Sequence, residues 1–98
     1  MAYTGPVKVA WDDAKNLANQ RRHGVSFEEA QAVFLDENAL MIHDPDNSDD
    51  EDRFVLLGLS AKIRLSAVCH CYRKGDEIIR IISARKATRI EQKRYWKR

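Results

Sequence analysis

Residues 80–95, RIISARKATRIEQKRY, join a strand pattern to a helix pattern and define the end of the fold. The apolar residues at the start are typical of a β-strand, and Thr88 followed by Glu91 fits the capping box that opens a helix. Arg85 and Lys86 lie at the junction. Fixed cations beside hydroxyl and titratable groups are what phosphate-ester chemistry requires. This stretch therefore predicts a last strand, a basic C-terminal helix and a phosphate site between them.

Three more strand patterns and two tight turns precede this stretch. The strand patterns cover residues 39–43, 53–59 and 65–72, and the last strand is expected over 77–83. Residues 60–64 and 73–76 are typical of tight turns. Because consecutive strands joined by tight turns pair in opposite directions, these segments predict an antiparallel sheet.

A short strand and a helix are expected near the start of the chain. Residues 7–11 alternate weakly and predict the strand. Asp12 or Asp13 then caps a helix that runs to about Arg22, and Gly24 suits the left-handed position after a helix end. We expect the inner stripe of this helix to consist of Ala14, Leu17 and Ala18.

A second helix follows at once. Ser26 and Glu29 form a capping box that opens it, and it is expected to reach about Leu35. Its inward residues are predicted to be Phe27, Ala30, Val33 and Phe34. The element order is β-α-α-β-β-β-β-α, which predicts an α+β fold with an antiparallel sheet covered by two N-terminal helices and a C-terminal helix.

The length and the apolar content bound the class of protein. A chain of 98 residues is expected to form one domain, over residues 1–98, and its 44% hydrophobic content supports one modest core. No stretch approaches the roughly 18–20 apolar residues that span a bilayer, and residues 1–6 lack the pattern of a secretory signal. We therefore expect a cytoplasmic protein without a membrane partner.

Charge is divided unevenly along the chain. Residues 1–52 carry 4 Lys/Arg against 12 Asp/Glu, whereas residues 53–98 carry 13 Lys/Arg against 3 Asp/Glu. Such asymmetry favours a basic surface that contacts nucleic acid. The alternative is a fold whose two halves neutralise each other across their contact.

The residues that could hold a metal have simpler explanations. Cys69 and Cys71 are expected on one face of a strand as buried thiols, with His70 on the other face. The acidic segment 44–52 lacks the glycine and the final glutamate of a calcium-binding loop, so a solvated or partner-binding loop is the better interpretation. We expect neither a metal nor a cofactor.

Three ordered groups of motifs resemble the BrnT family of toxins, over nearly the whole chain from Val7 to Tyr95. The first group is Trp11–Asn16, Arg22–Ala30 and Val33–Asp36; the second is Asp44–Asp46, Glu51–Phe54 and Gly58–Ala61; the third is Arg80–Thr88 with Glu91 and Tyr95. Two positions depart from the pattern. Arg22 stands where the family often has lysine, and residues 61–64 lack the commoner glycine of that turn.

The resemblance implies a function and a set of partners. BrnT proteins are toxins of type II toxin–antitoxin pairs that cleave RNA, with a fold similar to the RelE/ParE group. The implied partner is a BrnA-like antitoxin with a ribbon-helix-helix-type domain. It would neutralise the toxin and repress the operon, so the toxin would meet operator DNA only through the antitoxin. The RNA substrate, free or ribosome-bound, stays open.

Metal-independent RNA cleavage needs a base, an acid and cations around the phosphate. The residues expected to supply them are His23, Arg80, Arg85, Glu91 and Tyr95. Four of them have a structural alternative: a helix-end role for His23, a cross-strand ion pair for Arg80, a cap for Glu91, and packing of the last helix for Tyr95.

Further residues are expected to bind RNA without taking part in the reaction: Arg53, Ser83, Lys86, Lys93 and Arg94. A salt bridge for Arg53, a capping role for Ser83 and an antitoxin contact for the helix cations are the alternatives. His43 and His70 are expected to be structural. For the whole chain, the alternative to an endoribonuclease is a nucleic-acid-binding or interaction module without catalysis.

Overall fold

The computed structural model describes residues 8–43, 52–75 and 77–97. Residues 44–51, which hold most of the predicted acidic loop, lie outside the described residues, as do Val7 of the first predicted strand and Asp76 of the second turn.

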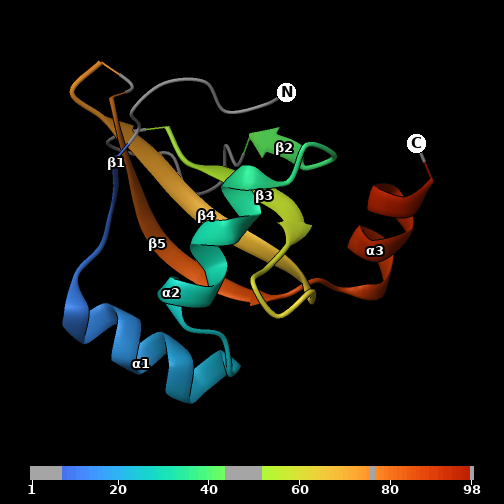
Figure 1. The fold of residues 1–98 in the computed structure, drawn as a ribbon, viewed down its shortest axis with the longest axis horizontal. Coiled ribbons are helices and arrows are strands. Elements are labelled where there is room, and N and C mark those ends of the chain that lie inside the picture. Colours follow the sequence, from blue (N-terminus) through green and yellow to red (C-terminus); the bar gives the residue numbers. More distant parts are fainter. Residues whose placement is uncertain (1–7, 44–51, 76, 98) are drawn as a thin grey trace.

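Five strands form one sheet in the order β1-β5-β4-β3-β2 (Figure 1). They are β1 Lys8–Ala10, β2 Leu40–His43, β3 Phe54–Leu59, β4 Leu65–Arg73 and β5 Ile78–Lys86. Strands β2 to β5 pair antiparallel, as predicted. The outer strand β1 pairs parallel to β5, which the turn pattern could not show because the segment that joins them is long. The predicted α+β class is confirmed.

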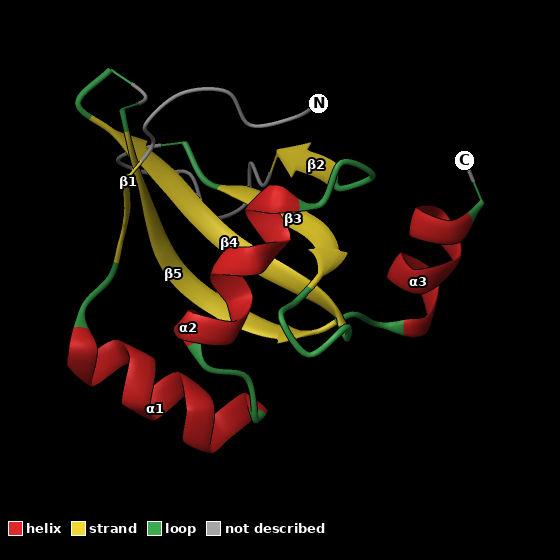
Figure 2. Ribbon diagram, viewed as in Figure 1, coloured by secondary structure: helices red, strands yellow, loops and turns green. Residues whose placement is uncertain are grey.

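In the described part of the chain, three α-helices and one 3-10 helix accompany the sheet (Figure 2). They are α1 Asp13–His23, α2 Phe27–Ala30, the 3-10 helix η1 Gln31–Leu35, and α3 Arg89–Trp96. The predicted caps are confirmed: Asp12 accepts from the Lys15 amide, Ser26 accepts from the Glu29 amide, and Gly24 has a left-handed φ of 72°. The second predicted helix therefore starts correctly but tightens into η1 after one turn.

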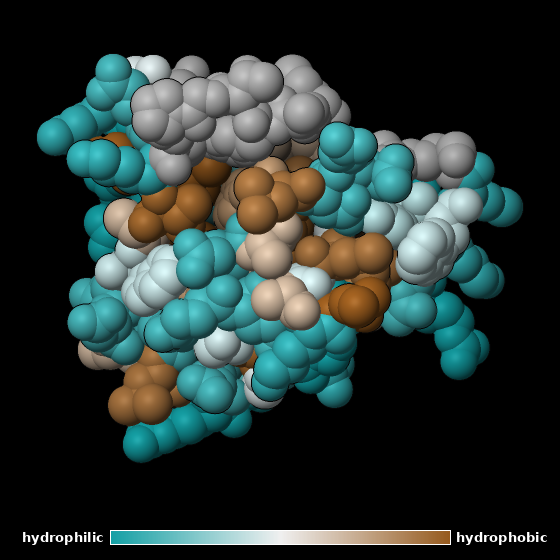
Figure 3. All heavy atoms as spheres, in the orientation of Figure 1, coloured by the Kyte–Doolittle hydropathy of each residue, from teal (hydrophilic) through white to brown (hydrophobic). Residues whose placement is uncertain are grey.

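Alternate residues of the strands divide between two apolar clusters, one on each face of the sheet. Leu56 and Val68 pack with α2 and η1, whereas Leu57 and Ala67 pack with Tyr95 of α3. Figure 1 shows α2 crossing in front of β4 and β5. On this helix-covered face hydrophobic side chains form separate groups among hydrophilic ones, as expected for a surface without a large apolar patch (Figure 3).

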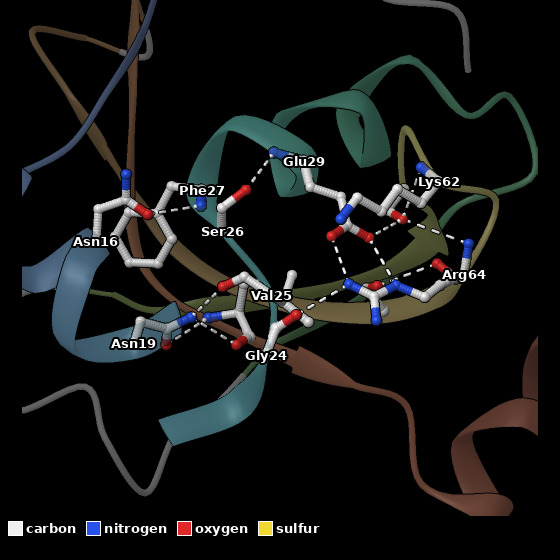
Figure 4. A network of polar contacts seen from close by, with 12 residues as sticks. Asn16, Asn19, Gly24, Val25, Ser26, Phe27, Glu29, Lys62 and Arg64 are labelled. Atoms are coloured by element: carbon white, nitrogen blue, oxygen red, sulfur yellow. Dashed lines mark hydrogen bonds and ion pairs between the residues drawn. The ribbon is translucent and has the colours of Figure 1, made fainter. Parts of the chain in front are cut away.

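The predicted inner stripe of α1 is wrong. Leu17 is 52% exposed, and Ala14 and Ala18 are exposed as well, whereas Asn16 and Asn19 are buried. The helix is therefore held by hydrogen bonds rather than by apolar packing. The side chain of Asn16 accepts from the Phe27 amide at 2.8 Å (Figure 4). It also donates to Glu28 at 2.7 Å.

Asn19 binds the free edge of β5 beyond the end of β1. Its side-chain amide donates to the Ala84 carbonyl at 2.8 Å and to the Val25 carbonyl at 2.9 Å, and it accepts from the Ala84 amide at 3.1 Å. Because β1 pairs only with residues 78–80, Asn19 supplies the hydrogen bonds that another strand would make at this position.

An ion pair between the buried Glu29 and the half-buried Arg64 joins α2 to the turn between β3 and β4 (Figure 4). The Arg64 guanidinium donates to both Glu29 carboxylate oxygens, at 2.9 and 2.5 Å, and to the Gly24 carbonyl at 3.0 Å. The Ser60 hydroxyl donates to the same carboxylate at 2.5 Å. The hydrogen bond from Arg64 is the main cause that lowers the pKa of Glu29 below 4.5, so this carboxylate is ionised at neutral pH.

Candidate active site on the basic sheet face

A β-bulge in β5 decides which side chains of this strand share a face. Cys69 pairs with Ser83, but the next residue of β4 pairs with Ile81, so Ile82 has no partner. This extra residue shifts the alternation, and Ala84 faces the same core cluster as Ile81. Side chains that a regular strand would divide between two faces are thereby brought together.

The side chains of Arg73, Arg80, Ser83 and Arg85 consequently lie on one face of β4 and β5, which we call the basic face. Among the described helices, α3 alone packs on this side, and it does so over β3 through Tyr95. Arg80, Ser83 and Arg85 are all half-buried. The basic face therefore presents cations and a hydroxyl over β5, beside the start of α3.

Arg85 and Glu91 form a two-pronged ion pair where β5 leads into α3. The two guanidinium nitrogens donate to the two carboxylate oxygens at 2.7 and 3.0 Å. The pair lowers the pKa of Glu91 and raises that of Arg85, so both are ionised at neutral pH. Glu91 also accepts from the Thr88 amide at 2.9 Å in the predicted capping box. It is both the cap and the partner of Arg85.

Arg80 lies farther along the same strand, between Cys71 of β4 and Ala10 of β1. Within the described ranges its guanidinium has no hydrogen bond or ion pair. At about 3.3 Å per residue, the five residues to Arg85 span roughly 16 Å of strand. The two arginine side chains thus share a face of the sheet, but their backbone positions on β5 are well separated.

Tyr95 faces the interior of the protein. It is 4% exposed, packs against Leu57 and Ala67, and donates its hydroxyl proton to Asp36 at 2.5 Å. The Asp36 carboxylate also accepts from the Leu59 amide at 2.9 Å. Through Asp36, Tyr95 therefore attaches α3 to the end of β3, in agreement with the packing alternative.

The Arg85–Glu91 ion pair does not include His23 or the remaining RNA-binding candidates. His23 ends α1, the helix whose Asn19 binds the backbone of Ala84 in β5. Arg53 precedes β3 and has a partner of its own. Lys86, Lys93 and Arg94 are exposed at the end of β5 and on α3. These three lysine and arginine side chains extend the positive charge beyond the basic face.

The buried histidine has a structural environment. His70 is fully buried among Phe34, Phe54 and Tyr72, and its Nδ1 lies 3.1 Å from the Val68 carbonyl oxygen. Burial lowers its pKa, so the ring is neutral. Within the described residues no group of three or more His, Cys, Asp or Glu side chains is arranged to hold a metal ion.

Sequence reasoning missed one groove at the edge of the sheet. It has a volume of about 510 Å³ and is lined by residues of β1 and the segment after it, by the end of β4 and the turn that follows, and by β5: Ala10, Trp11, Asp12, Arg73, Lys74, Ile78 and Arg80. The separate signals were a tryptophan after the first strand and two adjacent basic residues in a turn. Only the parallel pairing of β1 with β5 brings them together.

The fold and the motifs place this chain among the ribonuclease toxins of type II toxin–antitoxin systems. Within that class the chain belongs to the BrnT family, because residues 11–91 match the model for "Ribonuclease toxin, BrnT, of type II toxin-antitoxin system". It is similar to the crystal structure of the Brucella abortus ribonuclease toxin BrnT, with 26% identity and a TM-score of 0.61. That match covers 85% of this chain and 99% of the Brucella chain.

The comparison with curated proteins finds no match. In the described ranges, no helix is long and apolar enough to cross a membrane. The resemblance to BrnT toxins that the motifs indicate is confirmed by the family match and by the shared fold.

Proposed function

We propose that this toxin is an endoribonuclease that cleaves RNA on the basic face without a metal, by attack of the neighbouring 2′-hydroxyl. The observation that carries the proposal is the Arg85–Glu91 pair, which places a fixed cation and an ionised carboxylate within 3.0 Å of each other. The carboxylate is a proton acceptor, and the guanidinium can bind two oxygens of a phosphate.

In the proposed reaction Glu91 takes the proton of the 2′-hydroxyl, and the 2′-oxygen forms a bond to phosphorus. The bond from phosphorus to the 5′-oxygen breaks, and that oxygen takes a proton from water. The products carry a 2′,3′-cyclic phosphate and a 5′-hydroxyl. Arg85 stabilises the charge that develops on the phosphate oxygens. At neutral pH Glu91 is in its ionised, basic form.

Arg80 has a different role in this proposal. Its distance along β5 from Arg85 suits a contact with a flanking phosphate of the same RNA strand rather than with the reacting one. Removing it should therefore weaken RNA binding and raise KM, whereas removing Arg85 should lower kcat. Ser83 lies between the two on the same face, where its hydroxyl can donate to the RNA backbone.

The proposed partner is a BrnA-like antitoxin of the ribbon-helix-helix type. It would silence the toxin in the cytoplasm and bring the complex to operator DNA. Membership of a type II toxin family supports an antitoxin partner in general. The exposed basic residues Lys93 and Arg94 make α3 available to either the antitoxin or RNA.

The test is RNA cleavage by the purified protein in EDTA, with the ends of the products mapped. We expect 5′-hydroxyl ends from the unchanged protein, and a rate about 10²–10⁴-fold lower from Glu91→Gln. Arg85→Ala should be similarly impaired. Arg21→Ala, which removes an exposed arginine of α1, is the matched control and should cleave normally. Circular dichroism checks that each variant is folded.

The outcomes separate the alternatives. Equal cleavage by Arg85→Ala, Glu91→Gln and the control would refute this site. Intact RNA that is cut only after ribosomes are added would show that cleavage needs the ribosome. RNA that stays intact under both conditions, but binds with a steep salt dependence, would instead support a binding module without catalysis.

A further inference from the structure

We propose that the groove beside β1 binds one nucleotide of a single-stranded RNA, with its base against Trp11 and its phosphate between Lys74 and Arg80. This inference rests on the proposed function for the identity of the ligand as RNA. It adds a binding subsite about five residues of strand away from the Arg85–Glu91 pair.

The charge of the groove suits an anion. Three cationic side chains line it, Arg73, Lys74 and Arg80, against the single carboxylate of Asp12. Asp12 is already engaged as the cap of α1, because its Oδ1 accepts from the Lys15 amide at 3.1 Å. Arg73 also has a partner of its own, so the cations that the groove offers to a phosphate group are Lys74 and Arg80.

Trp11 gives the groove a wall that can recognise a base. The ring is half-buried and meets Phe27 edge-to-face, with centroids 6.1 Å apart and planes at 73°. This contact with the apolar core fixes the indole in place while the residue still lines the groove. A fixed aromatic ring beside cations is the arrangement on which unpaired bases stack, whereas the bases of a duplex are already stacked on each other.

Lys74 is an unusual residue for its backbone conformation. It has a φ of 50°, in the left-handed region, and Gly75 after it has a φ of 60°. Glycine or asparagine adopts this conformation at lower cost than lysine does. The backbone conformation at position 74 therefore does not explain why a lysine is present there. A positive charge at the rim of the groove would explain it.

Arg80 connects this groove to the reaction centre. It lines the groove, and its side chain lies on the same sheet face as Arg85. An RNA strand that follows β5 from Arg85 would meet Arg80 first and the groove next. The groove would then select single-stranded RNA and hold it in register with the Arg85–Glu91 pair.

The experiment uses an RNA oligonucleotide with 2′-O-methyl groups, which lacks the attacking hydroxyl and cannot be cleaved. In a Trp96→Phe protein, Trp11 is the one remaining tryptophan. We expect saturable quenching of its fluorescence as the oligonucleotide binds. Fluorescence anisotropy of a labelled oligonucleotide should show Trp11→Ala binding about 5- to 100-fold more weakly, and Trp11→Phe should recover part of the loss.

Lys74→Asn keeps the inference testable if the tryptophan variants do not fold. Asparagine suits the backbone conformation, so the variant should be at least as stable as the unchanged protein. It should nevertheless bind the oligonucleotide several-fold more weakly, and the slope of its log binding constant against log salt concentration should be smaller by about 1. Lys62→Asn, at the exposed turn between β3 and β4, is the matched control.

Binding without any change in Trp11 fluorescence would overturn the inference, and so would equal affinities for Lys74→Asn and Lys62→Asn. Quenching by an acidic peptide or by duplex RNA, but not by the single strand, would also overturn it. Because the oligonucleotide is not cleaved, the outcome is independent of catalysis. RNA cleavage by a protein whose groove binds no RNA would refute this subsite alone. RNA binding in the groove of a protein that never cleaves RNA would refute the proposed enzyme.

Discussion

Replacing Asn19 by alanine should destabilise this protein more than any apolar truncation on the same helix. The side chain makes three buried hydrogen bonds, two to Ala84 of β5 and one to the Val25 carbonyl. Alanine would leave an amide and two carbonyl groups buried without these partners. At about 1–3 kcal/mol for each unsatisfied group, with some relief from entering water, we expect a loss of about 3–5 kcal/mol. The whole free energy of unfolding of a small domain is only about 5–15 kcal/mol.

Urea denaturation followed by circular dichroism measures this change, with the slope of the transition as a check on two-state behaviour. Leu17→Ala is the control, because Leu17 is 52% exposed on the same helix and its truncation should cost no more than about 1 kcal/mol. A loss below about 1 kcal/mol for Asn19→Ala, or a larger loss for Leu17→Ala, would refute the idea that hydrogen bonds hold α1 to the sheet.

Three more predictions concern stability. Tyr95→Phe removes the donor to Asp36 and should cost about 1.5–3 kcal/mol in urea unfolding; lost cleavage at unchanged stability would instead show that Tyr95 is catalytic. Ile63 is exposed and has a φ of 57°, so Ile63→Gly should increase the free energy of unfolding by about 0.5–1 kcal/mol and raise the urea midpoint. A lower midpoint would contradict this account of backbone strain. The ion pair with Arg64 lowers the pKa of Glu29, so the stability that this pair contributes is complete above the unfolded pKa of 4.5 and is lost as the pH falls below 4.5. Glu29→Gln should therefore have a smaller free energy of unfolding at neutral pH and should lose less of it on acidification. Parallel pH profiles of stability for the two proteins would exclude this role.

Local chemistry in the sequence predicted the caps and the core of the second helix. A capping box depends on residues three positions apart, so the boxes at Ser26 and Thr88 are visible without any tertiary information. The predicted stripe of the first helix is wrong because apolar spacing does not mark the buried positions of this helix. Asn16 and Asn19 are buried since backbone groups of distant segments offer them partners, and no sequence window shows such partners.

The site was predictable in its residue types more than in its arrangement. The spacing of Arg85 and Glu91 allowed a contact, and the structure has it at 2.7 Å. The bulge at Ile82, which sets Arg85 on the face of Arg80, leaves no mark in the composition of the strand. The groove at Trp11 depends on a pairing between two distant segments, and the sequence pattern indicated antiparallel neighbours only.

The parallel pairing of β1 with β5 also sets an order of events during synthesis. Lys8 pairs with Ile78, which the ribosome adds 70 residues later. At about 5–20 residues per second, β1 waits on the order of 4–14 s for its neighbour to be made. Until then neither the groove at Trp11 nor the face that carries Arg80 and Arg85 exists. A nascent chain of this toxin is therefore unable to present the proposed RNA-binding surface while most of its length is still being translated.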